Sequence, residues 1–226
     1  MADFLLLIRS GRTAYDQEGR IKGTLDIPLS PAGIEEARGF ADRAVRMLGP
    51  HPPGVSSASK PLRRLFASPA RCARETAEIV GRRLGLKPQA CPGLGNLDHG
   101  LWQGLRVDEI EERQPRLHRQ WLENPWSVAP PEGELLDECC DRVAATLERI
   151  AKRLGRGGIA IVVPEPLERV IRWVVAGEHL GDLWRSVEGE EGVRLLSLGE
   201  QWTIRPLRLP PVRPPEPPPS GRGCRV

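Results

Sequence analysis

The sequence predicts an α/β domain, a three-layer α/β/α sandwich around a mostly parallel central sheet. Short apolar segments alternate with longer amphipathic ones, which is the order of strands and helices in such a fold. The segment 159–163 contains no polar residue, as is typical of a strand that helices cover on both faces. The length of 226 residues is enough for one domain of this kind with a sizeable core.

The first predicted strand and helix occupy the N-terminal 48 residues. Residues 4–8 are apolar and predict a strand. No basic leader precedes this run and no small-residue cleavage site follows it, so we expect a strand here and not a signal peptide. Ser30 and Pro31 then supply an N-cap and an N1 residue for a helix whose apolar residues recur at helical spacing as far as Leu48.

The second predicted strand and helix repeat this arrangement. Residues 65–67 predict a strand, and Ser68 with Pro69 resembles the N-cap and N1 pair of the first helix. The helix is expected to run to Leu84, because Gly85 is suited to the C′ position that ends a helix.

The C-terminal half adds the remaining layers and a tail. Three helices are expected, over residues 107–122, 135–154 and 167–176. Strand 159–163 ends at Pro164-Glu165-Pro166, and residues 193–205 predict one or two last strands. Residues 206–219 include eight prolines, so we divide the chain into a domain over 1–205 and an extended, disordered tail over 206–226.

Charge and hydropathy exclude two classes of partner. The formal net charge is +3, but residues 205–226 alone contain five arginines and one glutamate, so the domain is close to neutral. A neutral domain is not expected to bind nucleic acid. No apolar run approaches the roughly 20 residues that a transmembrane helix needs, so we expect no membrane association through such a helix.

The cysteines indicate a reducing compartment. Their spacing fits neither a metal site nor a disulfide framework. We therefore expect free thiols, a cytoplasmic location, no bound metal and no cofactor. The five are Cys72, Cys91, Cys139, Cys140 and Cys224.

Several motifs occur along the chain in a characteristic order. Residues 9–13 read Arg-Ser-Gly-Arg-Thr, residues 25–33 read Leu-Asp-Ile-Pro-Leu-Ser-Pro-Ala-Gly, and residues 67–77 combine Ala-Ser-Pro with Ala-Arg-Glu-Thr-Ala. Residues 97–105, residues 130–134 and Arg142 continue the series. On these motifs, which extend over residues 4–178, the chain resembles the histidine phosphatase superfamily. The resemblance implies the phosphoglycerate-mutase-like fold and phosphoryl-transfer chemistry.

The family's catalytic positions are nearly all replaced. The resemblance places Ser10 where the family has the histidine that attacks phosphorus, and Cys72 where it has a second arginine. It places Asn96 at the general-acid carboxylate and Glu165 at the second histidine, with Pro164 as the other alignment. Among the family's core catalytic positions, only the one at Arg9 retains the family residue. A serine hydroxyl needs a neighbouring base to become a nucleophile, and its phosphate ester would be stable.

Cations and anions compete in the expected site. Arg9, Arg12, Arg20, Lys22 and Arg71 lie in or near the motifs and are candidates for phosphate binding, with a solvent-exposed surface role as the alternative for Arg12, Arg20 and Arg71. Glu165, and Asp16 where the family has asparagine, would oppose an anion. Two like charges about 4 Å apart repel by about 4 kcal/mol at an effective dielectric of about 20.

Three further residues of these motifs are candidates for packing, redox chemistry or ligand binding. His99 stands where the family has an aromatic residue, so we expect it to contribute to packing and not to catalysis. Cys72 is expected to be a buried structural thiol, with a lowered pKa and a redox role as the alternative. Asn96 retains the capacity to hydrogen-bond a ligand.

The main functional hypothesis is a catalytically inactive pseudophosphatase with a binding or regulatory role. Its expected ligand is a phosphorylated small molecule or another anion. One alternative is an active phosphatase or mutase with relocated groups, such as Ser10 with Glu165, or Arg71 in place of the lost arginine. The other is a scaffold that recruits a protein partner through residues 206–226, where 208–214 read Arg-Leu-Pro-Pro-Val-Arg-Pro, a pattern that docks in aromatic grooves.

Overall fold

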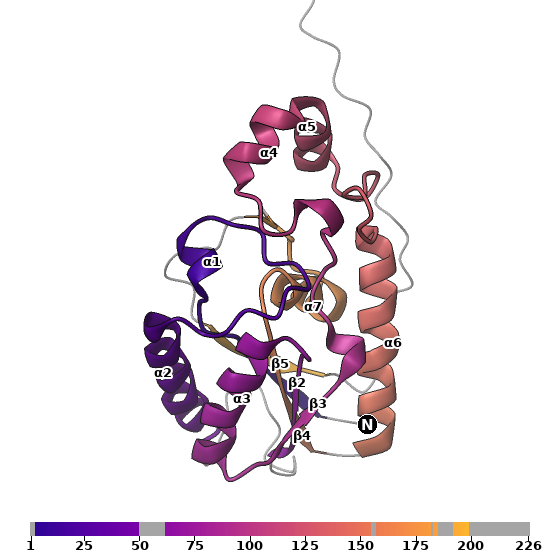
Figure 1. Cartoon of the computed structure of the whole chain (residues 1–226). Helices are drawn as coiled ribbons and strands as arrows, with labels where there is room; N and C mark the ends of the chain where they lie inside the picture. Colours follow the sequence, from indigo (N-terminus) through magenta and orange to yellow (C-terminus); the bar gives the residue numbers. More distant parts are fainter. Residues whose placement is uncertain (1–2, 50–61, 155–156, 182, 185–191, 199–226) are drawn as a thin grey trace, which may run out of the picture.

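The computed structural model describes residues 3–49, 62–154, 157–181, 183–184 and 192–198. Five strands form one sheet in the order β3-β2-β4-β1-β5 (Figure 1). Only the β1–β5 pair is antiparallel among these neighbours, so the mostly parallel α/β fold class is confirmed. The strands are β1 (Phe4–Arg9), β2 (Leu62–Ala67), β3 (Pro88–Ala90), β4 (Gly158–Val163) and β5 (Val193–Ser197).

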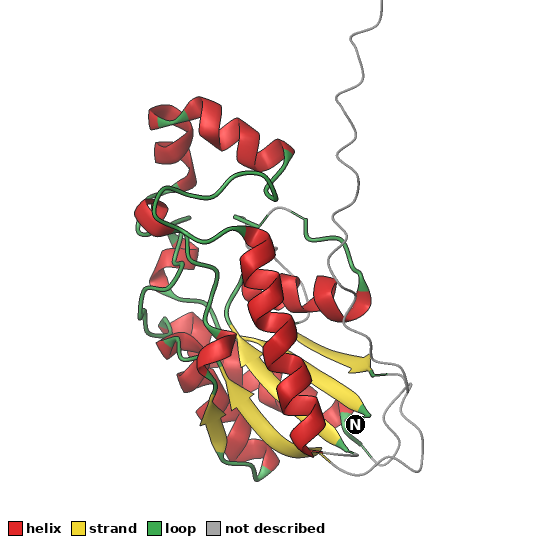
Figure 2. Cartoon of the chain, turned by 90° about the vertical axis from the view of Figure 1, so that its right-hand side faces the viewer, coloured by secondary structure: helices red, strands yellow, loops and turns green. Residues whose placement is uncertain are grey.

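Helices cover both faces of the sheet and its carboxyl end. Figure 2 shows α6 lying along one face of the sheet, and Figure 1 shows α4 and α5 beyond the strands. The helices are α1 (Ala14–Gln17), α2 (Pro31–Met47), α3 (Arg71–Leu84), α4 (Val107–Arg113), α5 (Pro115–Glu123), α6 (Leu136–Leu154) and α7 (Leu167–Ala176), and the 3₁₀ turns are η1 (Pro92–Leu94) and η2 (Gly100–Trp102).

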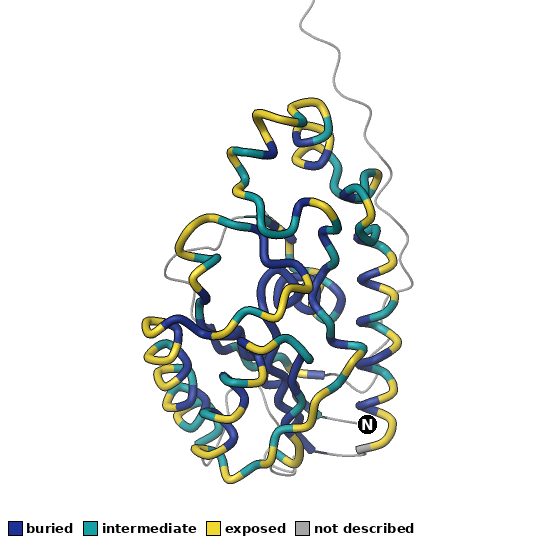
Figure 3. Tube along the Cα trace, in the orientation of Figure 1, coloured by how far each residue is buried: buried dark blue, intermediate teal, exposed yellow. Residues whose placement is uncertain are grey.

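Alternation along the central strands produces the three layers. Leu5 and Leu7 of β1 belong to the hydrophobic core that contains the buried residues of α6 and α7. Leu6 and Ile8 belong to a second core with alanines of α2 and α3. Successive strand residues point to opposite faces, so the apolar residues of one strand supply both cores. Figure 3 shows the buried strands between helices whose outer faces are exposed.

Two predicted helices differ from the observed ones. Ser68 does not cap α3, which begins at Arg71 with Ala70 as its N-cap. The backbone N–H of Ser68 instead donates to Val162 O, so the ladder between β2 and β4 extends past the end of β2. The single helix predicted over 107–122 is wrong because the chain turns at Gln114, and Pro115 begins a new helix, α5.

The other predicted elements are close to the observed ones. Residues 167–176 form α7 with the predicted bounds, and Ser30 and Pro31 begin α2. In segment 193–205 the structure contains β5, while residues 199–205 and the whole predicted tail lie outside the described residues. None of the helices in the described part of the chain combines the length and hydropathy that a bilayer crossing requires.

Candidate functional site

The loops that follow β1, β2 and β4 meet at the carboxyl end of the sheet. The N–H of Ser10 donates to Val163 O at 2.8 Å, and the N–H of Ser68 donates to Val162 O at 2.9 Å. The structure therefore brings together the segments that contain Arg9, Ser10 and Glu165. In open α/β sheets, this end of the strands is where ligands bind.

A small cavity, here called the charged pocket, lies at this end of the sheet. Its volume is about 30 Å³. A cavity needs roughly 10–15 Å³ to hold one water molecule, so the charged pocket is small, with room for one or two waters. It is lined by Asp16, Arg20, Ile21, Lys22, Gly23, His99, Glu165, Pro166, Leu183 and Trp184.

Lys22 and Asp16 form a buried ion pair in the wall of the charged pocket. Lys22 Nζ lies 2.7 Å from Asp16 Oδ1 and donates to Oδ2 at 2.8 Å. Thr13 also donates to Asp16 Oδ2 through its N–H and its hydroxyl. Burial raises the pKa of Asp16, but the charge of Lys22 and these hydrogen bonds outweigh burial and hold the pKa below 3.8. Burial lowers the pKa of Lys22, and the charge of Asp16 outweighs that effect.

Glu165 lies between two buried guanidinium groups. Its Oε1 is 3.8 Å from Arg9 Nη1 and 3.9 Å from Arg169 Nη2. Arg9 also lies over the ring of Phe40, with its Cζ 5.5 Å from the ring centroid. Glu165 and Asp16 were expected to present negative charge to an anion. Each has a cationic neighbour from the chain itself, so neither carboxylate stands as an uncompensated charge.

Ser10, Cys72 and Asn96 are all buried. Burial raises the pKa of the Cys72 thiol, while the charge of Lys22 and a hydrogen bond with the Ser10 side chain oppose that rise. The direction of this shift, which burial causes, favours the expected buried structural thiol over the alternative of a lowered thiol pKa. Asn96 Nδ2 donates to Gly23 O at 2.8 Å and to Glu165 O at 3.1 Å, so this side chain joins two loops of the site.

His99 faces the charged pocket as a neutral imidazole. Burial lowers its pKa to about 4. Its Nδ1 lies 3.2 Å from Leu97 O, which assigns the proton to Nδ1 and leaves Nε2 as an acceptor. Nε2 has no hydrogen-bond partner among the described residues. The ring also contacts Trp121, with 6.1 Å between centroids, which agrees with the expected packing role.

The five candidate phosphate-binding cations separate into two groups. Arg9, Lys22 and Arg20 lie at the site, and Arg20 donates to Gly104 O at 2.9 Å. Arg12 and Arg71 do not line the charged pocket, and each pairs with a glutamate, Arg12 with one on α2 and Arg71 with one on its own helix, α3.

The guanidinium groups of Arg12 and Arg71 each form an ion pair away from the charged pocket. Arg12 pairs with Glu36 of α2. Arg71 Nε donates to Glu75 Oε1 at 2.8 Å, and half of the Arg71 side chain is exposed. This pairing does not favour the alternative in which Arg71 takes the place of the family's second arginine.

Sequence reasoning missed Arg169 as a residue of the site. Arg169 is 3% exposed and follows Glu165 by four residues, one helical turn. Glu165 precedes the N-cap of α7 and Arg169 lies in its first turn, so the four-residue spacing that was visible in the sequence brings the two side chains together at the start of the helix. The pairing of Lys22 with Asp16 had no such signal, because both residues lie outside a common helix or strand.

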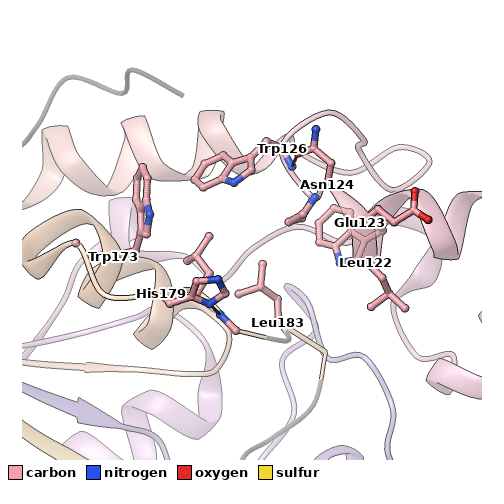
Figure 4. Close-up of a pocket in the computed structure, with 12 residues that line it drawn as sticks. Leu122, Glu123, Asn124, Trp126, Trp173, His179 and Leu183 are labelled. Atoms are coloured by element: carbon pink, nitrogen blue, oxygen red, sulfur yellow. Dashed lines mark hydrogen bonds between the residues drawn. The ribbon is translucent and has the colours of Figure 1, made fainter. Parts of the chain in front are cut away.

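A second and much larger cavity, here called the aromatic cleft, lies between α5 and the end of α7 (Figure 4). Its volume is about 660 Å³. Trp126 and Trp173 stand side by side in its wall, with 4.8 Å between ring centroids and an interplanar angle of 49°. It is lined by Trp121, Leu122, Glu123, Asn124, Pro125, Trp126, Trp173, Gly177, His179, Leu180, Gly181 and Leu183.

The described residues offer no metal centre. Among them, no group of three or more histidine, cysteine, aspartate or glutamate side chains is arranged to hold a metal ion. The four cysteines in the described segments are free thiols.

Comparison with known proteins gives consistent results. A family model described as histidine phosphatase superfamily (branch 1) matches residues 5–203. Phosphoserine phosphatase 1 of Hydrogenobacter thermophilus is 27% identical over 180 residues, which are 80% of this chain and 79% of that protein. Bifunctional protein Rv2228c of Mycobacterium tuberculosis is 30% identical over 171 residues, 74% of this chain but only 43% of that protein.

Solved structures show the same fold. The mycobacterial glucosyl-3-phosphoglycerate phosphatase Rv2419c in complex with VO3 superposes with a TM-score of 0.68 at 22% identity, over 80% of this chain and 86% of that one. Bacillus stearothermophilus YhfR superposes with a TM-score of 0.67 at 24% identity, over 83% and 86% of the two chains.

Proposed function

Because the chain belongs to the histidine phosphatase superfamily, we propose that it is a pseudophosphatase of that family. In this proposal the phosphoglycerate-mutase-like fold is retained, phosphoryl transfer is lost, and the protein acts in binding or regulation. The observation that carries the proposal is the charged pocket, whose 30 Å³ lie among ion pairs formed within the chain.

The electrostatics of the charged pocket support weak phosphate binding. A phosphate dianion needs preorganised cations that are free to face it. Lys22 already contacts both carboxylate oxygens of Asp16, at 2.7 and 2.8 Å. To bind phosphate, Lys22 would have to leave Asp16, and a buried carboxylate without its partner is costly.

The chemistry at Ser10 supports the absence of turnover. Ser10 Oγ is buried beside the Cys72 thiol, whose raised pKa keeps it protonated near neutral pH. A protonated thiol does not remove the proton of a serine hydroxyl. Asn96, at the position of the family's general acid, has an amide that cannot protonate a leaving group.

An assay of the purified chain tests the proposal. We expect p-nitrophenyl phosphate and a panel of phosphomonoesters to be hydrolysed no faster than in buffer, since loss of members of a cooperating catalytic group costs on the order of 10⁶ in rate. Calorimetric titration with inorganic phosphate is expected to give no saturable heat. Saturable hydrolysis that Ser10→Ala or Glu165→Ala abolishes would overturn the proposal.

A second candidate function is an active phosphatase with relocated groups, and His99 is the observation in its favour. Its Nε2 is an acceptor without a partner among the described residues, on a ring that lines the charged pocket. A neutral imidazole nitrogen is the type of nucleophile or base that the family chemistry uses. This candidate predicts hydrolysis that His99→Phe abolishes and Arg71→Ala leaves unchanged.

The proposal applies to residues 1–205 as one domain, and the family match to residue 203 supports that boundary. The names of the relatives suggest a phosphorylated small molecule as the ligand class that the family site once held. Free thiols among the described cysteines support a cytoplasmic location. Segment 206–226 lies outside the described residues, and the scaffold alternative would be contradicted by a deletion of it that retains all partners.

A further inference from the structure

Exposed cations gather where helices α2 and α3 end, at the amino edge of the parallel strands. The last two turns of each helix contain one carboxylate, Asp42 or Glu78, and two arginines. Arg46, Arg82 and Arg83 in these turns are exposed. Arg83 Nε donates to Asp42 Oδ1 at 3.0 Å, so the two helix ends are in contact. Figure 1 shows the two helices side by side.

Strand β2 adds two consecutive exposed arginines at the same edge. Leu62 pairs with Gly158 of β4 and Arg64 pairs with Ile159, so Arg63 is an additional residue in β2, a β-bulge. Successive strand residues ordinarily point to opposite faces, whereas here Arg63 and Arg64 are both exposed. Bulges redirect side chains in this way and are frequent next to active sites.

A hollow between the end of α3 and the start of β3 joins these arginines to a lysine. Its volume is about 480 Å³, and both Arg82 and Lys87 line it. Leu65 of β2 pairs with Pro88 of β3, so Arg64 and Lys87 directly precede paired residues of neighbouring strands. We define the basic edge as the exposed residues Arg46, Arg63, Arg64, Arg82, Arg83 and Lys87.

The helix macrodipole explains only part of the basic edge. Cations in the last turn of a helix offset the partial negative charge of its unpaired carbonyl groups, which accounts for the three arginines on α2 and α3. The other three residues of the basic edge lie in β2 or before β3 and offset no helix end. Segment 50–61, between α2 and β2, contains Lys60 and neither aspartate nor glutamate.

The chemistry of the basic edge fits an acidic polypeptide. Five of its six residues are arginines, whose planar guanidinium groups bind carboxylates through two parallel hydrogen bonds. The hollow is also lined by Leu86 and Pro88, which offer apolar contacts to a polypeptide chain.

The charge of the whole domain favours a short acidic segment over an extended polyanion. The domain is close to neutral, so carboxylates elsewhere on it offset the basic edge. A short segment contacts the basic edge alone, whereas a nucleic acid or a membrane surface extends past it toward those carboxylates. We propose that the basic edge is a docking surface for an acidic segment of a partner protein.

Binding of a labelled acidic peptide to the full-length protein tests the proposal. The probe is a short fluorescein-labelled peptide of alternating aspartate and alanine, followed by fluorescence anisotropy. The same peptide with asparagine in place of aspartate is the uncharged probe. The test variant is Arg63→Ser/Arg64→Ser. The matched control is Arg116→Ser/Arg119→Ser, which removes two exposed arginines from α5, beyond the opposite end of the sheet.

The expected result is a difference between the two double variants. Wild type is expected to bind the aspartate peptide saturably, more weakly as salt is added, and not to bind the asparagine peptide. Arg63→Ser/Arg64→Ser is expected to weaken binding by about tenfold and the α5 control by less than about twofold. Arg63→Lys/Arg64→Lys is expected to retain most of the affinity, and Arg82→Glu/Lys87→Glu to abolish binding, because two carboxylates then face the peptide.

Three results would overturn the proposal. One is the absence of saturable binding to wild type. Another is an equal loss of affinity in the α5 control, because net charge would then explain the binding. The third concerns single-stranded RNA and phosphatidylserine vesicles. If either binds at least about tenfold more tightly than the peptide and loses binding in Arg63→Ser/Arg64→Ser, the partner class is wrong. Arg82→Ser/Lys87→Ser replaces that variant if circular dichroism shows that it does not fold.

Discussion

Leu183 lines two cavities of opposite character. On one side lies the charged pocket of about 30 Å³, with its buried carboxylates and cations. On the other side lies the aromatic cleft of about 660 Å³, where indole rings form the wall and the described lining residues include neither lysine nor arginine. Among the described lining residues, the smaller cavity contains the cations and the larger one contains neither lysine nor arginine.

Under the proposed function, the difference between the two cavities explains how the site stays folded without the family's ligand. In an active phosphatase, bound substrate charge faces the site's cations. Here Asp16 and Glu165 face Lys22, Arg9 and Arg169 at 2.7 to 3.9 Å. Cations and anions in the same loops satisfy each other without an external anion, and the loops close around them.

The largest effect is expected from Lys22→Met, which removes the cation beside Asp16. The Asp16 side chain is 8% exposed, so it would remain as a buried, uncompensated carboxylate. Breaking a buried pair in this way typically costs about 3–5 kcal/mol. We expect the free energy of unfolding to fall by that amount, measured by urea denaturation at pH 7.

A double substitution sharpens the same comparison. Asp16→Asn/Lys22→Gln replaces both charges by neutral side chains of similar size, so most of the lost stability is expected to return. Arg38→Met, which removes an exposed pair with Glu35, is the matched control and is expected to cost less than about 1 kcal/mol. A similar small cost for Lys22→Met would show that the charged pocket is not held by this ion pair.

The second-largest effect is expected from low pH, which lowers the free energy of unfolding through His99. Its folded-state pKa of about 4 lies below the ordinary value of 6.5, so between these values the unfolded chain binds a proton that the folded chain excludes. Stability is therefore complete above pH 6.5 and declines as the pH falls toward 4, by about 3 kcal/mol in total. Urea denaturation at pH 7, 5.5 and 4 measures this decline, and His99→Phe is expected to flatten it.

Asp16 provides a check on the His99 prediction, because the two residues affect the free energy of unfolding in different pH ranges. Its pKa lies below 3.8, so its contribution is present above that value and is lost only as the pH falls below it. Wild type and His99→Phe are expected to differ between pH 6.5 and 4 and to decline together below pH 3.8. Parallel curves over the whole range would contradict the neutral, buried state of His99.

The sequence predicted the layers of the fold better than the details of helix starts. Ser30 and Ser68 both precede a proline, yet only Ser30 caps a helix, through a hydrogen bond from Gly33 N. Ser68 N bonds to Val162 O, a partner about a hundred residues away that local pattern does not reveal. Strand pairing at the centre of the sheet therefore outweighed a local capping preference.

The candidate site was predictable in its position but not in its internal pairing. Arg9, Ser10 and Glu165 follow predicted strands, and parallel strands bring their carboxyl ends to one edge. Lys22 was expected to bind phosphate, because its sequence position carries no information about Asp16. The pair forms only when the loops fold over each other, since the two residues belong to no common helix or strand.

A smaller effect is expected in the aromatic cleft. Trp126→Leu removes the tilted contact with Trp173 from a half-buried position, and such ring pairs contribute about 0.5–1.5 kcal/mol beyond burial. We expect a loss of about 1 kcal/mol in thermal unfolding, well below that of Lys22→Met. A loss of about 3 kcal/mol or more would mean that the cleft is a structural core and not an open binding surface.

The smallest effect is expected from Arg71→Ala. Arg71 pairs with Glu75 one helical turn away, and half of its side chain is exposed. Such surface pairs contribute about 0–1 kcal/mol, because water screens both charges and ordering two long side chains costs entropy. We expect a change of less than about 0.5 kcal/mol in urea denaturation and unchanged behaviour toward inorganic phosphate. If Arg71→Ala altered phosphate binding, the charged pocket would have to include Arg71 in solution. The separation of Arg9, Arg20 and Lys22 from Arg12 and Arg71 would then be wrong.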